Sequence, residues 1–179
     1  HTGTTGSASE ASFSWSHNPV GTPRGVLVFV MTMESENDYV STVTYDGTNI
    51  PSTSLGAITY GRVDVFFLGT GIPTTDPATV VVNRTNNATV IYAVCVTVTA
   101  ATNTETTGEV ELTGTGTLAE QSITDGSPGT NSVRFAGGFS GLSAVPAAGA
   151  NSTAVHSIDI GAVTAAVVRE TTAGQGSRS

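Results

Sequence analysis

The strongest structural signal in the sequence is residues 25–31, Gly-Val-Leu-Val-Phe-Val-Met. From Val26 to Met31 every side chain is apolar, which is typical of a strand that is buried on both faces of its sheet. Residues 11–16, Ala-Ser-Phe-Ser-Trp-Ser, show the other strand pattern, because apolar and hydroxyl side chains alternate. This alternation predicts a half-buried strand with one face toward a core and the other toward water.

The same patterns continue along the chain, separated by turn residues. Residues 39–45 end at Asp46-Gly47, a dipeptide strongly favoured in two-residue hairpin turns. No long stretch has the 3.6-residue period of an amphipathic helix. We therefore expect an all-β fold, a two-sheet antiparallel β-sandwich of jelly-roll type with about ten strands and little or no helix. Further strands are predicted over residues 62–68, 79–82, 90–99, 109–113, 133–139, 155–160 and 165–169.

The sequence shows no domain boundary, and we expect a single β-sandwich domain over residues 10–172, because such folds commonly reach this length as one domain. Residues 1–9 and 173–179 are rich in Gly, Ser and Thr, and are predicted to be flexible tails. The single cysteine, Cys95, lies in an apolar run and is predicted to be a small buried hydrophobe.

The charge balance argues against two classes of partner. The chain has 6 Lys+Arg against 14 Asp+Glu and a formal net charge of −8, whereas nucleic-acid binding relies on clustered Lys and Arg. The apolar stretch from Val26 to Met31 is far too short for a membrane-spanning helix, and no other apolar run reaches the necessary length. We expect neither a nucleic-acid partner nor a membrane span.

Four groups of residues carry a resemblance to a known family. They are residues 14–31, which begin Ser-Trp-Ser-His-Asn-Pro, residues 43–48 (Val-Thr-Tyr-Asp-Gly-Thr), residues 63–68 and residues 76–82. They resemble a jelly-roll domain family that recurs in bacteriophage structural proteins and in secreted bacterial surface proteins. The resemblance covers residues 12–99 and implies a decorative, adhesive or sugar-binding module on a virion or cell surface. It also implies one further apolar strand after residues 174–179, from a continuation of the chain or from a neighbouring subunit.

The residue patterns do not favour catalysis. His156 and Ser157 would point to opposite faces of a strand, although Asp159 is close by. Residues 138–141, Gly-Phe-Ser-Gly, only resemble the G-x-S-x-G turn of hydrolases. Glu109 and Glu111 share a strand face, which suits a solvated surface better than a glycosidase pair. We expect a protein that is not an enzyme and that uses no cofactor.

Two candidate binding sites remain from the sequence. Glu34, Glu36 and Asp38 form an acidic loop that could supply oxygen ligands to Ca²⁺, although the spacing of a dedicated calcium loop is missing and a solvated loop is favoured. Aromatic rings offer an apolar face to sugar rings, so Tyr45 and Tyr60 are candidate glycan contacts. Trp15 alternates with Phe13 and is assigned to the core.

The leading functional hypothesis is a non-enzymatic structural module on the surface of a virus or phage particle, as a capsid decoration or a surface-fibre domain. Its expected partners are further copies in a symmetric oligomer and other particle or surface proteins. One alternative is a carbohydrate-binding adhesion module of a secreted bacterial protein. Another is a subunit of an extracellular filament that receives its last strand from a neighbour. All three place the protein on a virion surface or outside the cell.

Overall fold

The computed structural model describes residues 1–6, 10–33, 40–52, 56–58, 61–85, 91–99, 123–124, 135–140, 152–159, 164–170 and 177–178. Most of these residues lie in strands, and none of them lies in a helix. The chain divides into two compact units, His1–Thr107 and Gly108–Ser179. This division differs from the single domain predicted over residues 10–172.

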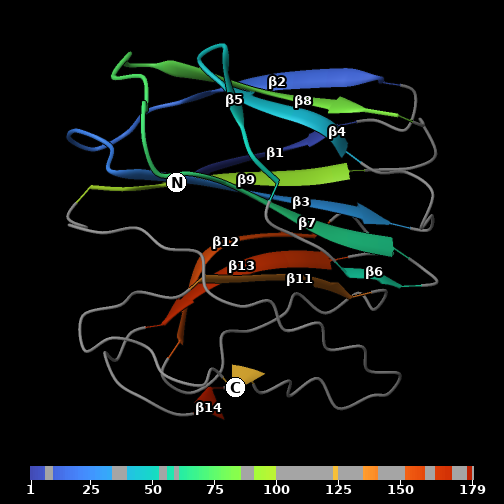
Figure 1. Ribbon diagram of the computed structural model, residues 1–179. Coiled ribbons are helices and arrows are strands. Elements are labelled where there is room, and N and C mark those ends of the chain that lie inside the picture. The colour runs from blue at the N-terminus through green and yellow to red at the C-terminus, as the bar shows by residue number, and fades with distance from the viewer. Residues whose placement is uncertain are drawn as a thin grey trace. The chain divides into compact units, whose positions relative to one another are not determined.

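The first unit is a β-sandwich of two antiparallel sheets (Figure 1). The five-stranded sheet has the order β1-β9-β3-β7-β6, and the four-stranded sheet has the order β2-β8-β4-β5. The strands are β1 (Thr2–Gly6), β2 (Ser12–His17), β3 (Gly25–Met33), β4 (Val40–Tyr45), β5 (Thr48–Ile50), β6 (Gly56–Ile58), β7 (Gly61–Leu68), β8 (Ala78–Arg84) and β9 (Ile91–Val98).

This strand order is that of a jelly roll. β1 pairs with β9, β2 with β8, β3 with β7 and β4 with β5, as in one long antiparallel hairpin. The hairpin is rolled up, so that β9 also pairs with β3 and β8 with β4. The eight strands of a jelly roll are thus complete between Thr2 and Val98, with β6 as an addition at the edge, and the predicted fold class is confirmed. The sandwich does not require the further strand that the family resemblance implies.

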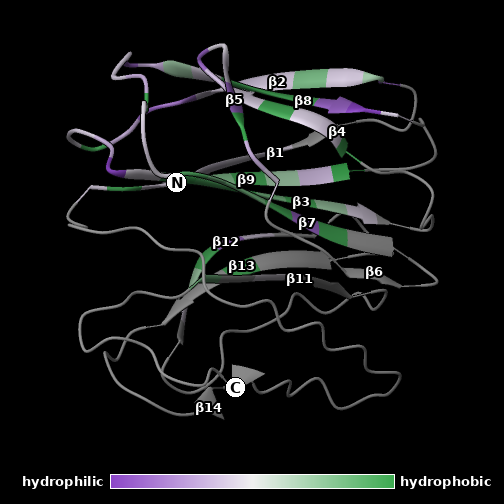
Figure 2. Cartoon of the chain, viewed as in Figure 1, coloured by the Kyte–Doolittle hydropathy of each residue, from purple (hydrophilic) through white to green (hydrophobic). Residues whose placement is uncertain are grey.

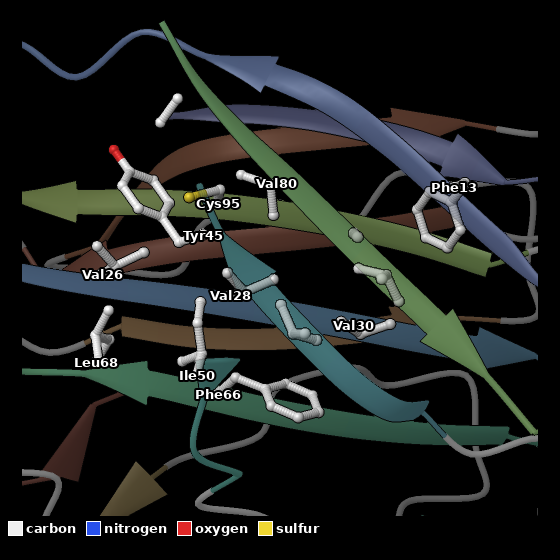
Figure 3. Packing of buried hydrophobic residues seen from close by; sticks show 14 of the residues in the cluster. Phe13, Val26, Val28, Val30, Tyr45, Ile50, Phe66, Leu68, Val80 and Cys95 are labelled. Atoms are coloured by element: carbon white, nitrogen blue, oxygen red, sulfur yellow. The ribbon is translucent and has the colours of Figure 1, made fainter. Parts of the chain in front are cut away.

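The core of the sandwich follows directly from the strand registers. Phe13, Val82, Val43 and Ile50 lie opposite one another and form one row across the four-stranded sheet. All four are buried because their strands turn alternate residues toward the second sheet. Cys95 is buried in this core, as predicted. The five-stranded sheet contributes Val26, Val28, Val30, Phe66, Leu68, Ile91, Ala93 and Cys95 to the same cluster (Figure 3).

The two sheets differ on the faces that point away from this core. On the five-stranded sheet, Phe29 and Met31 alternate with the core residues of β3 and are also buried, with 3% and 0% exposure. The predicted burial of this strand on both faces is therefore confirmed. On the four-stranded sheet, the alternating side chains of β2 are serines, and they are exposed to water. Figure 2 shows this as alternating green and pale bands along β2.

The hairpin between β4 and β5 turns at Asp46-Gly47, as the sequence predicts. Both turn residues have positive φ, 46° at Asp46 and 78° at Gly47. This geometry is that of the tight turn which matches the twist of a hairpin, and it favours Asp-Gly because these residues tolerate left-handed conformations. The turn is also held to β8 of the same sheet, because the Asp46 amide donates to the Thr79 carbonyl at 2.7 Å.

Within the predicted flexible tails of residues 1–9 and 173–179, the described residues 2–6 and 177–178 lie in strands. Thr2–Gly6 forms β1 and pairs along its whole length with β9. β14 (Ser177–Arg178) pairs with β10 (Ile123–Thr124). Short Thr- and Gly-rich segments carry no strand pattern of their own, and here the edge of a partner strand supplies the hydrogen-bonding template.

The second unit has a three-stranded antiparallel sheet with the order β11-β13-β12, besides the β10–β14 pair. Its strands are β11 (Phe135–Ser140), β12 (Ser152–Asp159) and β13 (Thr164–Glu170), close to three of the predicted ranges. The pairing of β12 with β13 shifts register between Ala154 and His156, so Val155 occupies a bulge. Val167 is buried. The strand predicted over residues 109–113 lies outside the described residues.

Candidate functional site

The candidate glycan contacts are not brought together on a described surface. Tyr45 belongs to the buried core cluster and has 0% exposure, so its ring is not available to a sugar in solvent. This corrects the prediction for Tyr45. The cause is the strand alternation, since Tyr45 is two residues from Val43 and lies on the same inward face. Tyr60 lies outside the described residues.

The candidate calcium loop cannot be placed, because Glu34, Glu36 and Asp38 all lie outside the described residues. Within the part of the chain that the structure describes, no group of three or more His, Cys, Asp or Glu side chains could hold a metal ion. Glu109 and Glu111 also lie outside the described residues.

The hydrolase-like residues sit on strands of the second unit. His156 is half-buried and its neighbour Ser157 is exposed, both within β12. Burial lowers the pKa of His156. Ser140 is the last residue of β11 and pairs with Thr164, so it lies in a regular strand. In a nucleophile elbow the serine would instead lie in a sharp turn.

A buried polar cluster, which the sequence patterns did not single out, lies between the sheets of the sandwich. We call Thr2, Trp15, His17, Tyr45 and Thr97 the His17 cluster. The Oγ1 atom of Thr2 lies 2.8 Å from Nδ1 of His17, and Oγ1 of Thr97 lies 3.1 Å from its Nε2. Both ring nitrogens of His17 are therefore occupied by hydroxyl groups. The cluster joins β2 of one sheet to β1 and β9 of the other.

Two aromatic residues complete the cluster. Trp15 donates its Nε1–H to the Thr2 hydroxyl at 2.9 Å. The Trp15 ring stacks on Phe13, with ring centroids 6.1 Å apart, and packs against the core. The core assignment of Trp15 is confirmed, since the side chain faces inward. Tyr45 meets His17 edge to face, with ring centroids 6.0 Å apart.

Burial dominates the electrostatics of these groups. His17 has 0% exposure, and loss of hydration lowers its pKa from 6.5 to about 4. The α-ammonium group of His1 lowers this pKa further, whereas Asp76 raises it. Burial also raises the pKa of Tyr45 and of Cys95 to about 12 each. At neutral pH the imidazole and hydroxyl groups of the cluster are therefore uncharged, as is the thiol of Cys95 in the neighbouring core.

The arrangement is suited to holding strands together rather than to chemistry on a substrate. A histidine beside a hydroxyl group resembles a base and its nucleophile, but His17 is sealed from solvent. With a pKa of about 4, its ring is a neutral structural partner at pH 7. The inward position of His17 could have been inferred from the sequence. Phe13, Trp15 and His17 are each two residues apart, so they lie on the same inward face of the strand.

A second feature is the outer face of the four-stranded sheet, which we call the hydroxyl face. Ser12 lies opposite Asn83, Ser14 opposite Val81 and Ser16 opposite Thr79. The rows continue onto β4, where Thr42 lies opposite Asn83 and Thr44 opposite Val81. Asn83 donates its side-chain amide to the Thr42 hydroxyl at 2.8 Å. The face consists of Ser12, Ser14, Ser16, Thr42, Thr44, Asn49, Thr79, Val81 and Asn83, and it carries no charged side chain.

The fold and this site define a jelly-roll β-sandwich with an apolar core, an internal His17 cluster and one hydroxyl-rich outer face. No family model, curated protein or solved structure matches the chain. Among the described residues, no helix is long and apolar enough to cross a membrane.

Proposed function

We propose that the chain is a non-enzymatic structural module on the surface of a virus or phage particle, as a capsid decoration or a surface-fibre domain. The observation that carries the proposal is the complete jelly-roll strand order between Thr2 and Val98. Jelly rolls are a common architecture of viral capsid proteins. This warrant is an analogy of fold, and the motif resemblance of residues 12–99 points in the same direction.

The hydroxyl face is the surface that we assign to contacts with neighbouring subunits or with the particle. Its side chains are short, so they lose little conformational entropy when a partner orders them. It carries no charge that a partner would have to neutralise. Both properties favour a flat, repeated contact in a symmetric assembly. The proposed location is the virion surface.

The direct test is co-sedimentation of the protein with purified particles from its source. The proposal predicts a fixed stoichiometry on the particle and a defined oligomer in light scattering of the free protein. Ser14→Arg places a charge in the middle of the hydroxyl face, and we expect it to lower particle occupancy about tenfold or more, which corresponds to about 1.4 kcal/mol of binding free energy. Val20→Arg is the matched control, because Val20 is 87% exposed in a loop. A protein that never accompanies particles would refute the proposal.

The second candidate function is a carbohydrate-binding adhesion module, since lectin domains also use jelly rolls. The observation that favours it is the set of hydroxyl and amide groups on the hydroxyl face, which match the uncharged hydroxyl groups of neutral sugars. A screen of immobilised neutral glycans tests it. Binding that is lost in Ser14→Arg and retained in Val20→Arg would favour adhesion through this face. Binding that is lost in Tyr60→Ala would place the glycan at the other predicted contact.

The filament hypothesis depends on a strand supplied by a neighbour. The jelly-roll order is complete without one, so polymerisation would have to use the sheet edges or the hydroxyl face. The mass of the purified species tests this hypothesis, because a stable monomer of 18.0 kDa at high concentration contradicts a filament subunit.

A further inference from the structure

β1 has few interactions that hold it in the sandwich. It lies at the edge of the five-stranded sheet and is hydrogen-bonded to β9 alone among the strands of that sheet. Its sequence, Thr-Gly-Thr-Thr-Gly, brings no large apolar side chain, and Thr2, Gly3 and Thr4, whose burial is described, do not belong to the core cluster. A strand of this kind opens locally at much lower free energy than the strands that carry the core.

The side-chain anchor of β1 is the hydroxyl group of Thr2. It accepts a hydrogen bond from Trp15 Nε1 at 2.9 Å and lies 2.8 Å from His17 Nδ1. Thr2 is paired with Cys95 of β9, so its side chain points inward with that residue. Detachment of β1 therefore breaks both contacts and opens the space beside the His17 ring to water.

The His17 cluster accommodates a neutral ring better than a protonated one. A neutral imidazole donates from one nitrogen and accepts at the other, which suits two hydroxyl partners. After protonation both nitrogens donate, and the hydroxyl group that donated to the ring loses its acceptor. The imidazolium would also be a charge without a hydrogen-bonded carboxylate, in a site with 0% exposure.

The ionisable groups around His17 come from each neighbouring element. Tyr45 of β4 faces the ring edge to face, and Asp46 and Cys95 lie close enough to affect Tyr45. Asp76, before β8, favours the protonated ring, whereas the α-ammonium group beside β1 disfavours it. Of these groups, Tyr45 and Cys95 stay neutral throughout the acidic range. His17 is therefore the group of this cluster that gains a proton on acidification, and between pH 7 and pH 5 it does so in the form in which β1 is detached and the ring is hydrated.

We propose that β1 is an acid-released strand, in which protonation of His17 detaches Thr2–Gly6 from the sandwich and uncovers the edge of β9. The uncovered edge presents backbone groups that can pair with another strand. This property is independent of whether the module sits on a particle, because it rests on contacts within the sandwich.

The size of the effect follows from linkage. With β1 attached, burial holds the pKa of His17 at about 4, and with β1 detached and the ring in water it returns toward 6.5. The detached form then binds the proton more tightly, so its population rises as the pH falls. At pH 5 the equilibrium between attached and detached β1 should favour detachment by roughly thirtyfold more than at pH 7.5.

Hydrogen exchange of the full chain, measured by mass spectrometry at several pH values, tests the proposal. We expect the protection factors of Thr2–Gly6, which are already corrected for intrinsic exchange, to lie well below those of β3 at each pH and to fall by roughly thirtyfold between pH 7.5 and pH 5. In His17→Gln, a neutral side chain that keeps a donor and an acceptor, this dependence should disappear. His156→Gln is the matched control and should behave like the wild type.

Two results would overturn the proposal. One is a protection of β1 that does not change with pH in the wild type, and the other is the same change in His17→Gln as in the wild type. If His17→Gln does not fold, the ring protons of His17 can be titrated by NMR in the wild type. The proposal requires His17 to titrate well below 6.5 while β1 is attached, and the protection of β1 to fall already between pH 6.5 and pH 4. Titration of His17 near 6.5 with β1 still protected would refute it.

Discussion

The two sheets of the sandwich contribute to one core, yet their outer faces are opposite in character. The outer face of the five-stranded sheet is apolar, with Phe29 and Met31 of β3 buried beside Tyr92 and Val94 of β9. The outer face of the four-stranded sheet is the hydroxyl face, whose serines on β2 are exposed. Apolar residues thus fill every position of β3 from Val26 to Met31, but only alternate positions of β2.

This difference between the two outer faces explains the two strand patterns in the sequence, the continuous apolar run of β3 and the alternation of β2. A continuous apolar run reports burial on two faces, and strict alternation reports burial on one. Substitutions at matched positions on the two sheets should therefore have very different costs, and this contrast can be measured.

The largest effect is expected for a charge placed in the shared core. Val28→Asp should lower the free energy of unfolding by about 5 kcal/mol or more, because Val28 has 0% exposure and packs among apolar side chains. Ser14→Asp introduces the same side chain on the hydroxyl face and should cost less than about 1 kcal/mol. Urea unfolding followed by circular dichroism measures both values. Similar costs for the two variants would contradict the assignment of the faces.

The next effect separates the two outer faces directly. Phe29→Ala should destabilise the protein by about 3–4 kcal/mol, as is typical when a large buried side chain is truncated. Val81→Ala, in the half-buried middle of the hydroxyl face, should cost less than about 1 kcal/mol. The same urea titrations apply. A small cost at Phe29 would mean that the outer face of the five-stranded sheet contributes little to stability.

The sequence predicted the residues with regular periodicity well. The strands around Phe13 and Val28 and the Asp46-Gly47 turn were found, because local pattern and tertiary structure agree at these positions. Tyr45 was misassigned as an exposed contact, although its spacing from Val43 places it inward. The sequence also contains no clear marker for the end of the sandwich at β9, because turn residues and weaker strand patterns continue beyond residue 100.

Other features depend on tertiary contacts and leave little trace in a local pattern. β1 reads as a Gly- and Thr-rich tail, since its strand conformation comes from pairing with β9, which lies far away in the sequence. The His17 cluster likewise depends on Thr2 and Thr97, which the rolled hairpin brings to the same histidine. Alternation predicted that His17 faces inward, but not which hydroxyl groups it would meet.

The pH dependence of global stability tests the buried state of His17. Its pKa in the folded protein, about 4, lies below the value of 6.5 expected in the unfolded chain. The unfolded chain therefore binds more protons between these values, so the stabilisation is complete above pH 6.5 and is lost as the pH falls toward 4. Between pH 7.5 and pH 4 the wild type should lose about 3 kcal/mol of its free energy of unfolding through His17. This contribution should be absent in His17→Gln. Urea titrations at both pH values measure it, and equal losses in the two proteins would show that other groups are responsible.

The smallest expected effect concerns the hydroxyl group of Tyr45. It is buried and has no hydrogen-bond partner among the described residues, whereas the Tyr45 ring packs in the core beside Cys95 (Figure 3). Tyr45→Phe keeps the ring and removes a polar atom that lost its hydration on folding, so it should raise the free energy of unfolding by up to about 1 kcal/mol. Val43→Ala, on the same strand and the same inward face, is the control and should lower it by about 2 kcal/mol. A loss of 1 kcal/mol or more in Tyr45→Phe would instead show that an ordered water occupies this end of the core and bonds to the hydroxyl group, because only a satisfied buried hydroxyl contributes to stability.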